Sequence, residues 1–320
     1  MSEPSFFEHF KLEGNPLTKL GRFYFILIFI KIISVISSFA LYLWISSVLA
    51  KFIATQNPRF LTDALYTMGI VITISFIVSL IILCSLAFLY YQAGEYSDIN
   101  KMRWISILLG ITAVLFLVGF PLVILGYLEL ASKIPYGGPI HMSEVMLMAI
   151  GSIIAGIGGL FSFIADIILI VMLFQISESL RIDFATFAAV LIILRMVFGF
   201  INGMIKVSDP TTAAAKAVIS LISGVIGIAI LYYLSKTFTR MGEIFENIEQ
   251  NPEILENAIK ELESMETPID LRKFSRERTI PFELFIKEIR DRIIKGELKG
   301  NVIGNTYYPQ KAQQSVSTSS

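Results

Sequence analysis

The sequence has few of the residues that enzymes most often use for chemistry, with one cysteine and two histidines in 320 residues. Cys84 cannot form an intrachain disulfide. His9 and His141 stand far apart, without a Cys or His partner at metal-ligand spacing. No H-E-x-x-H, G-x-S-x-G or G-x-x-x-x-G-K-[ST] motif occurs. We therefore expect a protein that is not an enzyme and that holds neither a cofactor nor a metal.

Charge is also scarce. Asp, Glu, Lys and Arg make up 16% of the chain, against about 25% in soluble domains. The formal net charge is zero, which excludes a global field that would recruit nucleic acid or anionic lipid. The charges cluster in residues 1–22 and 236–320, and the segment between them is mainly apolar. This pattern indicates a membrane body flanked by polar ends.

Six apolar runs are long enough to cross a bilayer, which requires about 20 helical residues. They cover residues 23–50, 66–91, 104–130, 145–176, 186–205 and 213–234. The predicted fold class is an all-α polytopic membrane protein with about six transmembrane helices and a small C-terminal α+β domain. Pro121 interrupts the third run, so this run is either one kinked helix or two half-helices.

The basic residues outside the runs predict the orientation. An even number of spans places both termini on one side, and that side carries eight basic residues against five on the other. Because Lys and Arg are enriched in cytoplasmic loops, we expect both termini in the cytosol and the spans in the plasma membrane.

Two charged residues lie deep in neighbouring runs. Asp166 precedes the turn at Leu180–Arg181 by as many residues as Arg195 follows it. Residues equally far from the turn of a helical hairpin lie at equal depth, so an intramembrane ion pair is predicted. In a structural interpretation the ion pair only fixes the two helices of the hairpin against each other. In a functional interpretation it forms a switch or part of an ion path. Small residues at four-residue spacing predict helix packing at Gly156, Gly159, Gly199 and Gly203.

The C-terminal part reads as a soluble module. The predicted organisation is a cytosolic segment (1–22), a transmembrane domain (23–235), a juxtamembrane amphipathic helix (236–251), a folded domain (252–309) and a disordered tail (310–320). Within the folded domain we expect a helix from Pro252, a short strand and a short second helix, and a third helix from Pro281. Two short strands should follow around the two-residue turn Gly304–Asn305.

The stretch "RIIKGELKGNVIGNTYYP", residues 292–309, resembles the end of winged helix-turn-helix domains, in which the last helix runs into G-x-[IL]-x-G and a hairpin. It is similar to the winged helices of PCI-type domains and of archaeal regulators. The membrane body weakly resembles uncharacterised archaeal multi-pass membrane proteins in its Ile-rich spans. The resemblance implies a winged helix over residues 252–309 that binds either DNA or protein.

The charge of residues 252–309 favours a protein partner over DNA. Residues 252–309 carry ten basic and eleven acidic side chains, and the third helix holds three acid-before-base pairs at i,i+4: Glu283–Lys287, Glu288–Arg292 and Asp291–Lys295. Carboxylates then lie where phosphates would bind. One local excess, formed by Arg272, Lys273, Arg276 and Arg278, is a candidate patch for a partner, nucleic acid or lipid headgroups.

We expect a membrane-anchored adaptor or regulator that binds the bilayer and, through residues 252–309, a cytosolic protein. A transporter or channel with a regulatory domain is one alternative. A membrane-tethered transcription regulator is the other.

Overall fold

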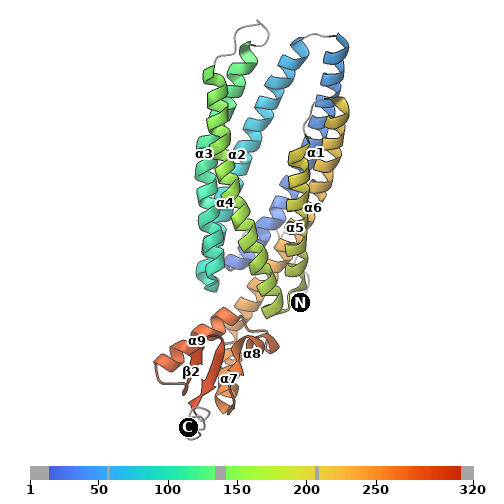
Figure 1. Ribbon diagram of the computed structural model, residues 1–320. Coiled ribbons are helices and arrows are strands. Elements are labelled where there is room, and N and C mark those ends of the chain that lie inside the picture. The colour runs from blue at the N-terminus through green and yellow to red at the C-terminus, as the bar shows by residue number, and fades with distance from the viewer. Residues whose placement is uncertain (1–13, 56–57, 134–141, 206–208, 311–320) are drawn as a thin grey trace.

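The computed structural model describes residues 14–55, 58–133, 142–205 and 209–310, and six long helices form its body (Figure 1). Each is long and apolar enough to cross a membrane, so the chain is a multi-pass membrane protein in contact with lipid. The helices are α1 (Pro16–Thr55), α2 (Pro58–Ser97), α3 (Asn100–Lys133), α4 (Met142–Leu180), α5 (Asp183–Met204) and α6 (Pro210–Gln250). Of the predicted tail 310–320, residues 311–320 lie outside the described part.

Most of these helices are longer than the apolar runs predicted. With 40 residues at about 1.5 Å each, α1 is roughly 60 Å long, twice the thickness of the hydrocarbon core. The ends of such helices must therefore lie in the headgroup region or in water. Pro121 lies inside α3, which remains one helix. The third span is thus a single helix and not two half-helices.

The helices pack as two sets. α3 packs along α2 and α4, whereas α6 packs along α1 and α5. Figure 1 shows α3 and α4 diverging from α1, α5 and α6 toward the end remote from the C-terminus, with α2 between them. The buried core lies at the opposite end of the bundle. It extends along the helices as far as Leu27 on α1, Ala165 on α4, Ile192 on α5 and Ile230 on α6. The two sets are therefore held together near the C-terminal unit.

Glycines allow close helix crossings, but not at the positions predicted. A Cβ on Gly151 of α4 would lie 2.7 Å from the carbonyl oxygen of Gly119 on α3, so only glycine fits there. A Cβ on Gly224 of α6 would lie 2.3 Å from Cγ2 of Val35 on α1, closer than any real contact. The two crossings join α3 to α4 and α1 to α6.

The packing predicted at Gly156, Gly159, Gly199 and Gly203 is wrong within the described chain. All four are exposed, and a Cβ built on each meets no heavy atom within 4 Å. Small-residue spacing identifies one face of a helix, but it does not say which neighbour covers that face.

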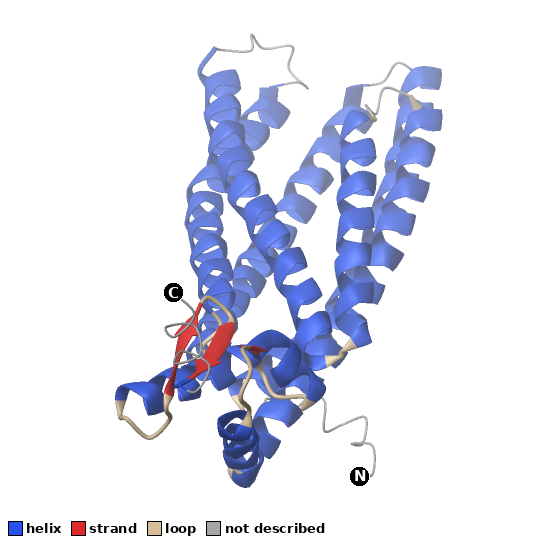
Figure 2. Ribbon diagram, turned by 60° about the horizontal axis from the view of Figure 1, so that its bottom comes forward, coloured by secondary structure: helices blue, strands red, loops and turns tan. Residues whose placement is uncertain are grey.

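A small α+β unit follows α6 (Figure 2). Its elements are α7 (Glu253–Ser264), β1 (Ile269–Asp270), α8 (Leu271–Glu277), α9 (Phe282–Ile294), β2 (Gly300–Ile303) and β3 (Thr306–Pro309). The strands form an antiparallel sheet in the order β1-β3-β2. The hairpin turn at Gly304–Asn305 is as predicted, and Gly304 has a φ of +62°, which glycine adopts without strain.

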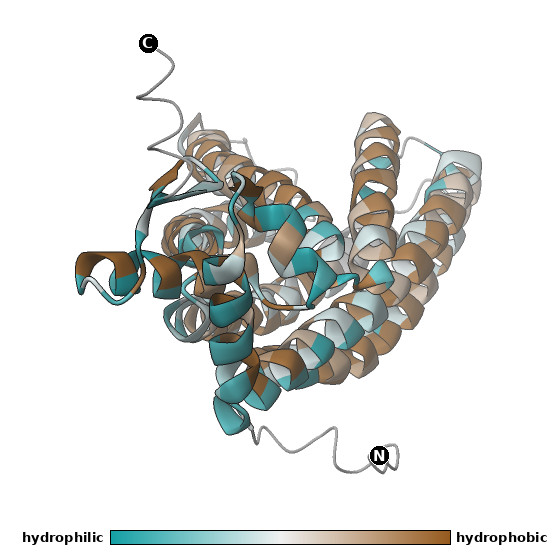
Figure 3. Ribbon diagram, turned by 90° about the horizontal axis from the view of Figure 1, so that it is seen from below, coloured by the Kyte–Doolittle hydropathy of each residue, from teal (hydrophilic) through white to brown (hydrophobic). Residues whose placement is uncertain are grey.

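The unit has a hydrophobic core of its own. Leu262 of α7, Leu271 of α8 and Phe285 and Ile289 of α9 are fully buried there, with Tyr307 of β3 beneath them. Viewed from below, the unit is largely hydrophilic on its outside, while the helices behind it are mainly hydrophobic (Figure 3). Residues 236–250 are the last turns of α6, and Asn251 caps this helix, which carries the chain from the membrane body into the unit without a break.

Candidate functional site

The structure brings the two deep charges together. Nη2 of Arg195 on α5 lies 3.1 Å from Oδ2 of Asp166 on α4, and the guanidinium donates a hydrogen bond to the carboxylate. Asp166 directly follows the core residue Ala165 on α4, and Arg195 lies three residues beyond the core residue Ile192 on α5. The side chains retain 28% and 43% of their accessible surface. The pair therefore lies at the edge of the core and is partly exposed.

Other polar groups lie near this pair. The hydroxyls of Tyr24 on α1 and Tyr90 on α2 are 2.7 Å apart, and Phe238 of α6 stacks on Tyr24 at 5.8 Å between ring centroids. Asp166 and Arg195 both act electrostatically on Tyr24. These three rings join α1, α2 and α6 within the buried core.

The soluble unit neutralises much of its own charge. Nε of Arg292 on α9 lies 2.8 Å from Glu288, and its Nη2 lies 2.6 Å from Glu256 of α7. Hydrogen bonds from Arg292 lower the pKa of Glu256, and the two carboxylates raise the pKa of Arg292. This network joins the first and third helices of the unit.

Arg278 is not part of an exposed basic patch, contrary to the prediction. Its guanidinium forms a two-pronged ion pair with Glu261 of α7 and stacks on the ring of Phe274 at 3.5 Å. The hydrogen bonds from Arg278 lower the pKa of Glu261. Arg278 is thus a structural contact between α7 and the end of α8. The pairing was not predictable because it depends on how two helices pack.

The rest of the patch is exposed. Arg272, Lys273 and Arg276 of α8 point outward, and Arg272 also lies 5.2 Å from the ring of Phe282. Helix α8 contacts the end of α4. The structure therefore places three cations beside the membrane body, at the end where the unit is attached.

The sequence did not predict a second contact between the C-terminal unit and the membrane body. Nζ of Lys287 on α9 lies 3.0 Å from Oδ2 of Asp98, in the turn between α2 and α3. Arg103 approaches the same carboxylate at 3.3 Å. Lys287 was expected to pair with Glu283, one helical turn earlier. The actual partner is distant in sequence, and no local pattern indicates it.

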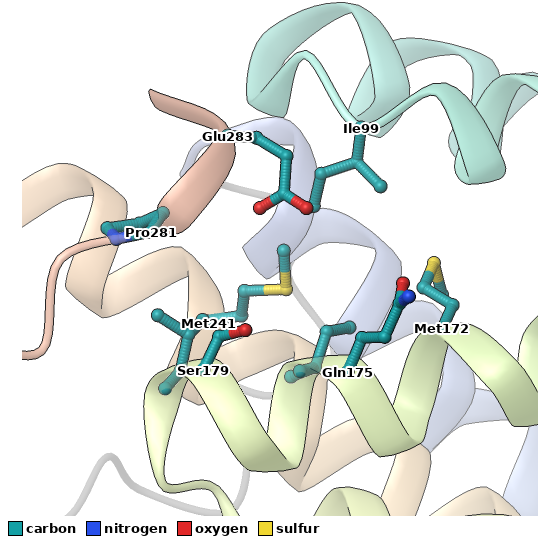
Figure 4. A pocket seen from close by; sticks show the side chains of 9 residues that line it. Ile99, Met172, Gln175, Ser179, Met241, Pro281 and Glu283 are labelled. Carbon is teal, nitrogen blue, oxygen red and sulfur yellow. The ribbon is translucent and has the colours of Figure 1, made fainter. Parts of the chain in front are cut away.

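Two hollows flank this contact. A cavity of about 20 Å³, enough for about one water, lies where Pro281 and Glu283 meet Met172, Gln175 and Met241 (Figure 4). Figure 4 shows the Glu283 carboxylate pointing into it. A groove of about 410 Å³ lies on the other side, between the α2–α3 turn and the outer face of α9. Unit and body thus meet through both apolar side chains and the Lys287–Asp98 ion pair.

Within the described residues, no group of three His, Cys, Asp or Glu side chains could hold a metal ion. No family model matches the chain, and no curated protein or solved structure is significantly similar to it.

Proposed function

We propose that the protein is a membrane-anchored adaptor or regulator, and that its C-terminal unit is a winged helix that docks a protein partner. The order of elements in the unit, helix–strand–helix–helix–hairpin, supports this proposal, because it is the order that the sequence resemblance implies, and the three strands form one antiparallel sheet. In this assignment α9 is the third helix, and the β2–β3 hairpin is the wing.

The observation that carries the docking function is that three basic groups on and beside α9 are already paired with carboxylates. A DNA-binding surface needs free Lys and Arg to replace the counterions of phosphates. Arg292, Arg278 and Lys287 are instead paired with carboxylates. Lys287 on the outer face of α9 also bonds Asp98 in the α2–α3 turn, so the membrane body already occupies this part of the helix. A protein surface is the better partner for such a unit.

The proposed orientation is cytosolic for the unit and for both termini. The start of α1, the α2–α3 and α4–α5 turns and the unit all lie at one end of the body. That end carries the larger number of basic residues, as the positive-inside rule requires of a cytoplasmic face.

A test of this function uses the full-length protein in lipid nanodiscs and fluorescently labelled duplex DNA. We expect binding no tighter than the non-specific range, roughly 10⁻⁴ to 10⁻⁶ M at physiological salt. Sub-micromolar, sequence-selective binding would overturn the docking proposal and would favour a tethered transcription regulator.

A second candidate function is a transporter or channel that the unit regulates. The ion pair Asp166–Arg195, at the edge of the buried core, supports it, because intramembrane charges often mark substrate or ion pathways. Solute flux in liposomes, compared between the wild type and Arg195→Met, tests this candidate. Equal flux in protein-free liposomes would exclude it for the solutes assayed.

A further inference from the structure

Three cations of α8 have no part in the docking function. Arg272, Lys273 and Arg276 are exposed and share one face of this helix, whereas Leu271 and Phe274 on its other face are buried. Within the described part of the chain, none of the three cations forms a salt bridge or donates a side-chain hydrogen bond. The face is therefore free to bind a group of negative charge.

The acidic side chains of the same segment are engaged. Oδ1 of Asp270 accepts hydrogen bonds from the backbone amides of residues 272 and 273 and so caps α8. Glu277 lies 3.8 Å from Arg278, which also pairs with Glu261. The exposed charges around the neighbouring α4–α5 turn are Glu178, Arg181 and Asp183. Even with these two carboxylates counted, positive charge is in excess beside α8.

The length of α5 places α8 relative to the bilayer. α5 has 22 residues, which at about 1.5 Å each make roughly 33 Å, little more than the hydrocarbon core of about 30 Å. Its first residue, Asp183, must therefore lie at the boundary with the headgroups. Leu180, three residues earlier at the end of α4, lines the small cavity together with Pro281 of the unit. Unit and body thus meet at the level of the headgroups.

Helix α8 lies at this meeting point. It packs against the end of α4 (Figure 1). The guanidinium of Arg272 lies 5.2 Å from the ring of Phe282, the residue that follows Pro281. The headgroup region is about 5–8 Å thick on each side of the core, and Lys and Arg side chains are long enough to extend into it. Lipid phosphates are therefore the anions nearest to these cations.

We propose that Arg272, Lys273 and Arg276 bind the phosphate groups of anionic phospholipids in the leaflet next to the unit. The guanidinium groups donate paired hydrogen bonds to phosphate oxygens, and the ammonium adds a point charge. Each cation strengthens attachment to an anionic surface roughly fivefold, so all three together strengthen the attachment of α8 roughly a hundredfold. This surface is separate from the β2–β3 hairpin and does not depend on the docking function.

The experiment is labelling of lysine amines with an uncharged succinimidyl ester, followed residue by residue by mass spectrometry. Full-length protein in nanodiscs of phosphatidylcholine is compared with protein in nanodiscs of equal parts phosphatidylcholine and phosphatidylglycerol. We expect labelling of Lys273 to be roughly tenfold slower in the anionic nanodiscs and to recover at high salt. Lys260 of α7, which lies 3.9 Å from Glu256 within the unit, should react equally in both.

Variants test whether charge on α8 causes the protection. Arg272→Gln with Arg276→Gln should lose most of the protection of Lys273, whereas Arg272→Lys with Arg276→Lys should keep it. Lys260→Gln is the matched control and should leave it at the wild-type level. The proposal is overturned if Lys273 reacts equally in both lipids, or if its protection survives in the Gln variant. It is also overturned if glycerol phosphate or duplex DNA, added to phosphatidylcholine nanodiscs, protects Lys273 as well as phosphatidylglycerol does.

Discussion

Reversing the charges of Asp166 and Arg195 should reveal how strongly the two side chains depend on each other. At 3.1 Å and an effective dielectric constant of about 20, the Coulomb attraction is about 5 kcal/mol. Desolvation of both groups offsets most of this attraction. We therefore expect a net coupling free energy of about 1–2 kcal/mol.

Each single variant should lose more stability than the double variant does. Asp166→Arg places a second cation against Arg195, and Arg195→Asp places a second carboxylate against Asp166. Each leaves uncompensated charge in the membrane, which costs roughly 2.5–3.5 kcal/mol per group. The double variant restores one charge of each sign at the same depth and should recover part of that loss.

Reversible unfolding in mixed micelles, followed by helical circular dichroism during an SDS titration, measures all four proteins. The neutral pair Asp166→Asn with Arg195→Met is the control, and it should unfold within about 1 kcal/mol of the wild type. The reasoning fails if the charge-swapped double variant is no more stable than the worse single variant.

Three further outcomes are expected. Gly151→Leu should destabilise the α3–α4 crossing by about 1–3 kcal/mol in the same titration, because backbone atoms must move, whereas Gly156→Leu should change little. Lys287→Glu should speed hydrogen exchange of amides 98–103, and adding Asp98→Lys should slow it again; unchanged exchange would show that the contact stabilises nothing. Because Arg278 lowers the pKa of Glu261 in the folded unit, Glu261 stabilises the unit above its ordinary pKa, and this contribution disappears as pH falls through the lowered value. Urea titrations at pH 7 and pH 3 should thus show Glu261→Gln weakening the unit more at pH 7 than at pH 3.

Features set by local chemistry were predictable from sequence. The six apolar runs correspond to six helices because length and composition alone decide whether a segment can span a bilayer. The Gly304–Asn305 turn follows from the φ values that a two-residue hairpin demands. Matched distance from a turn was enough to place Asp166 and Arg195 at one depth, although depth alone does not set the direction of either side chain.

Features that depend on how helices are rotated against each other were not predictable. Gly199 and Gly203 share the spacing of a packing motif but face away from every described neighbour, while Gly151, at the start of the same run as Gly156, makes the α3–α4 contact. Arg278 was expected in a surface patch, and its guanidinium instead pairs with Glu261. In each case the deciding contact joins residues that no sequence period relates.

The most direct test of the docking function is photo-crosslinking from Ile303 of the full-length protein in its native membrane. Ile303, beside the turn of the β2–β3 hairpin, is 62% exposed and belongs to the C-terminal unit. A photoreactive residue at this position should form one adduct of defined mass that protease removes and nuclease leaves intact. The same probe at Val225, which is exposed on α6, should not form it. A nuclease-sensitive adduct at position 303, or the same adduct from both positions, would contradict a protein-docking unit.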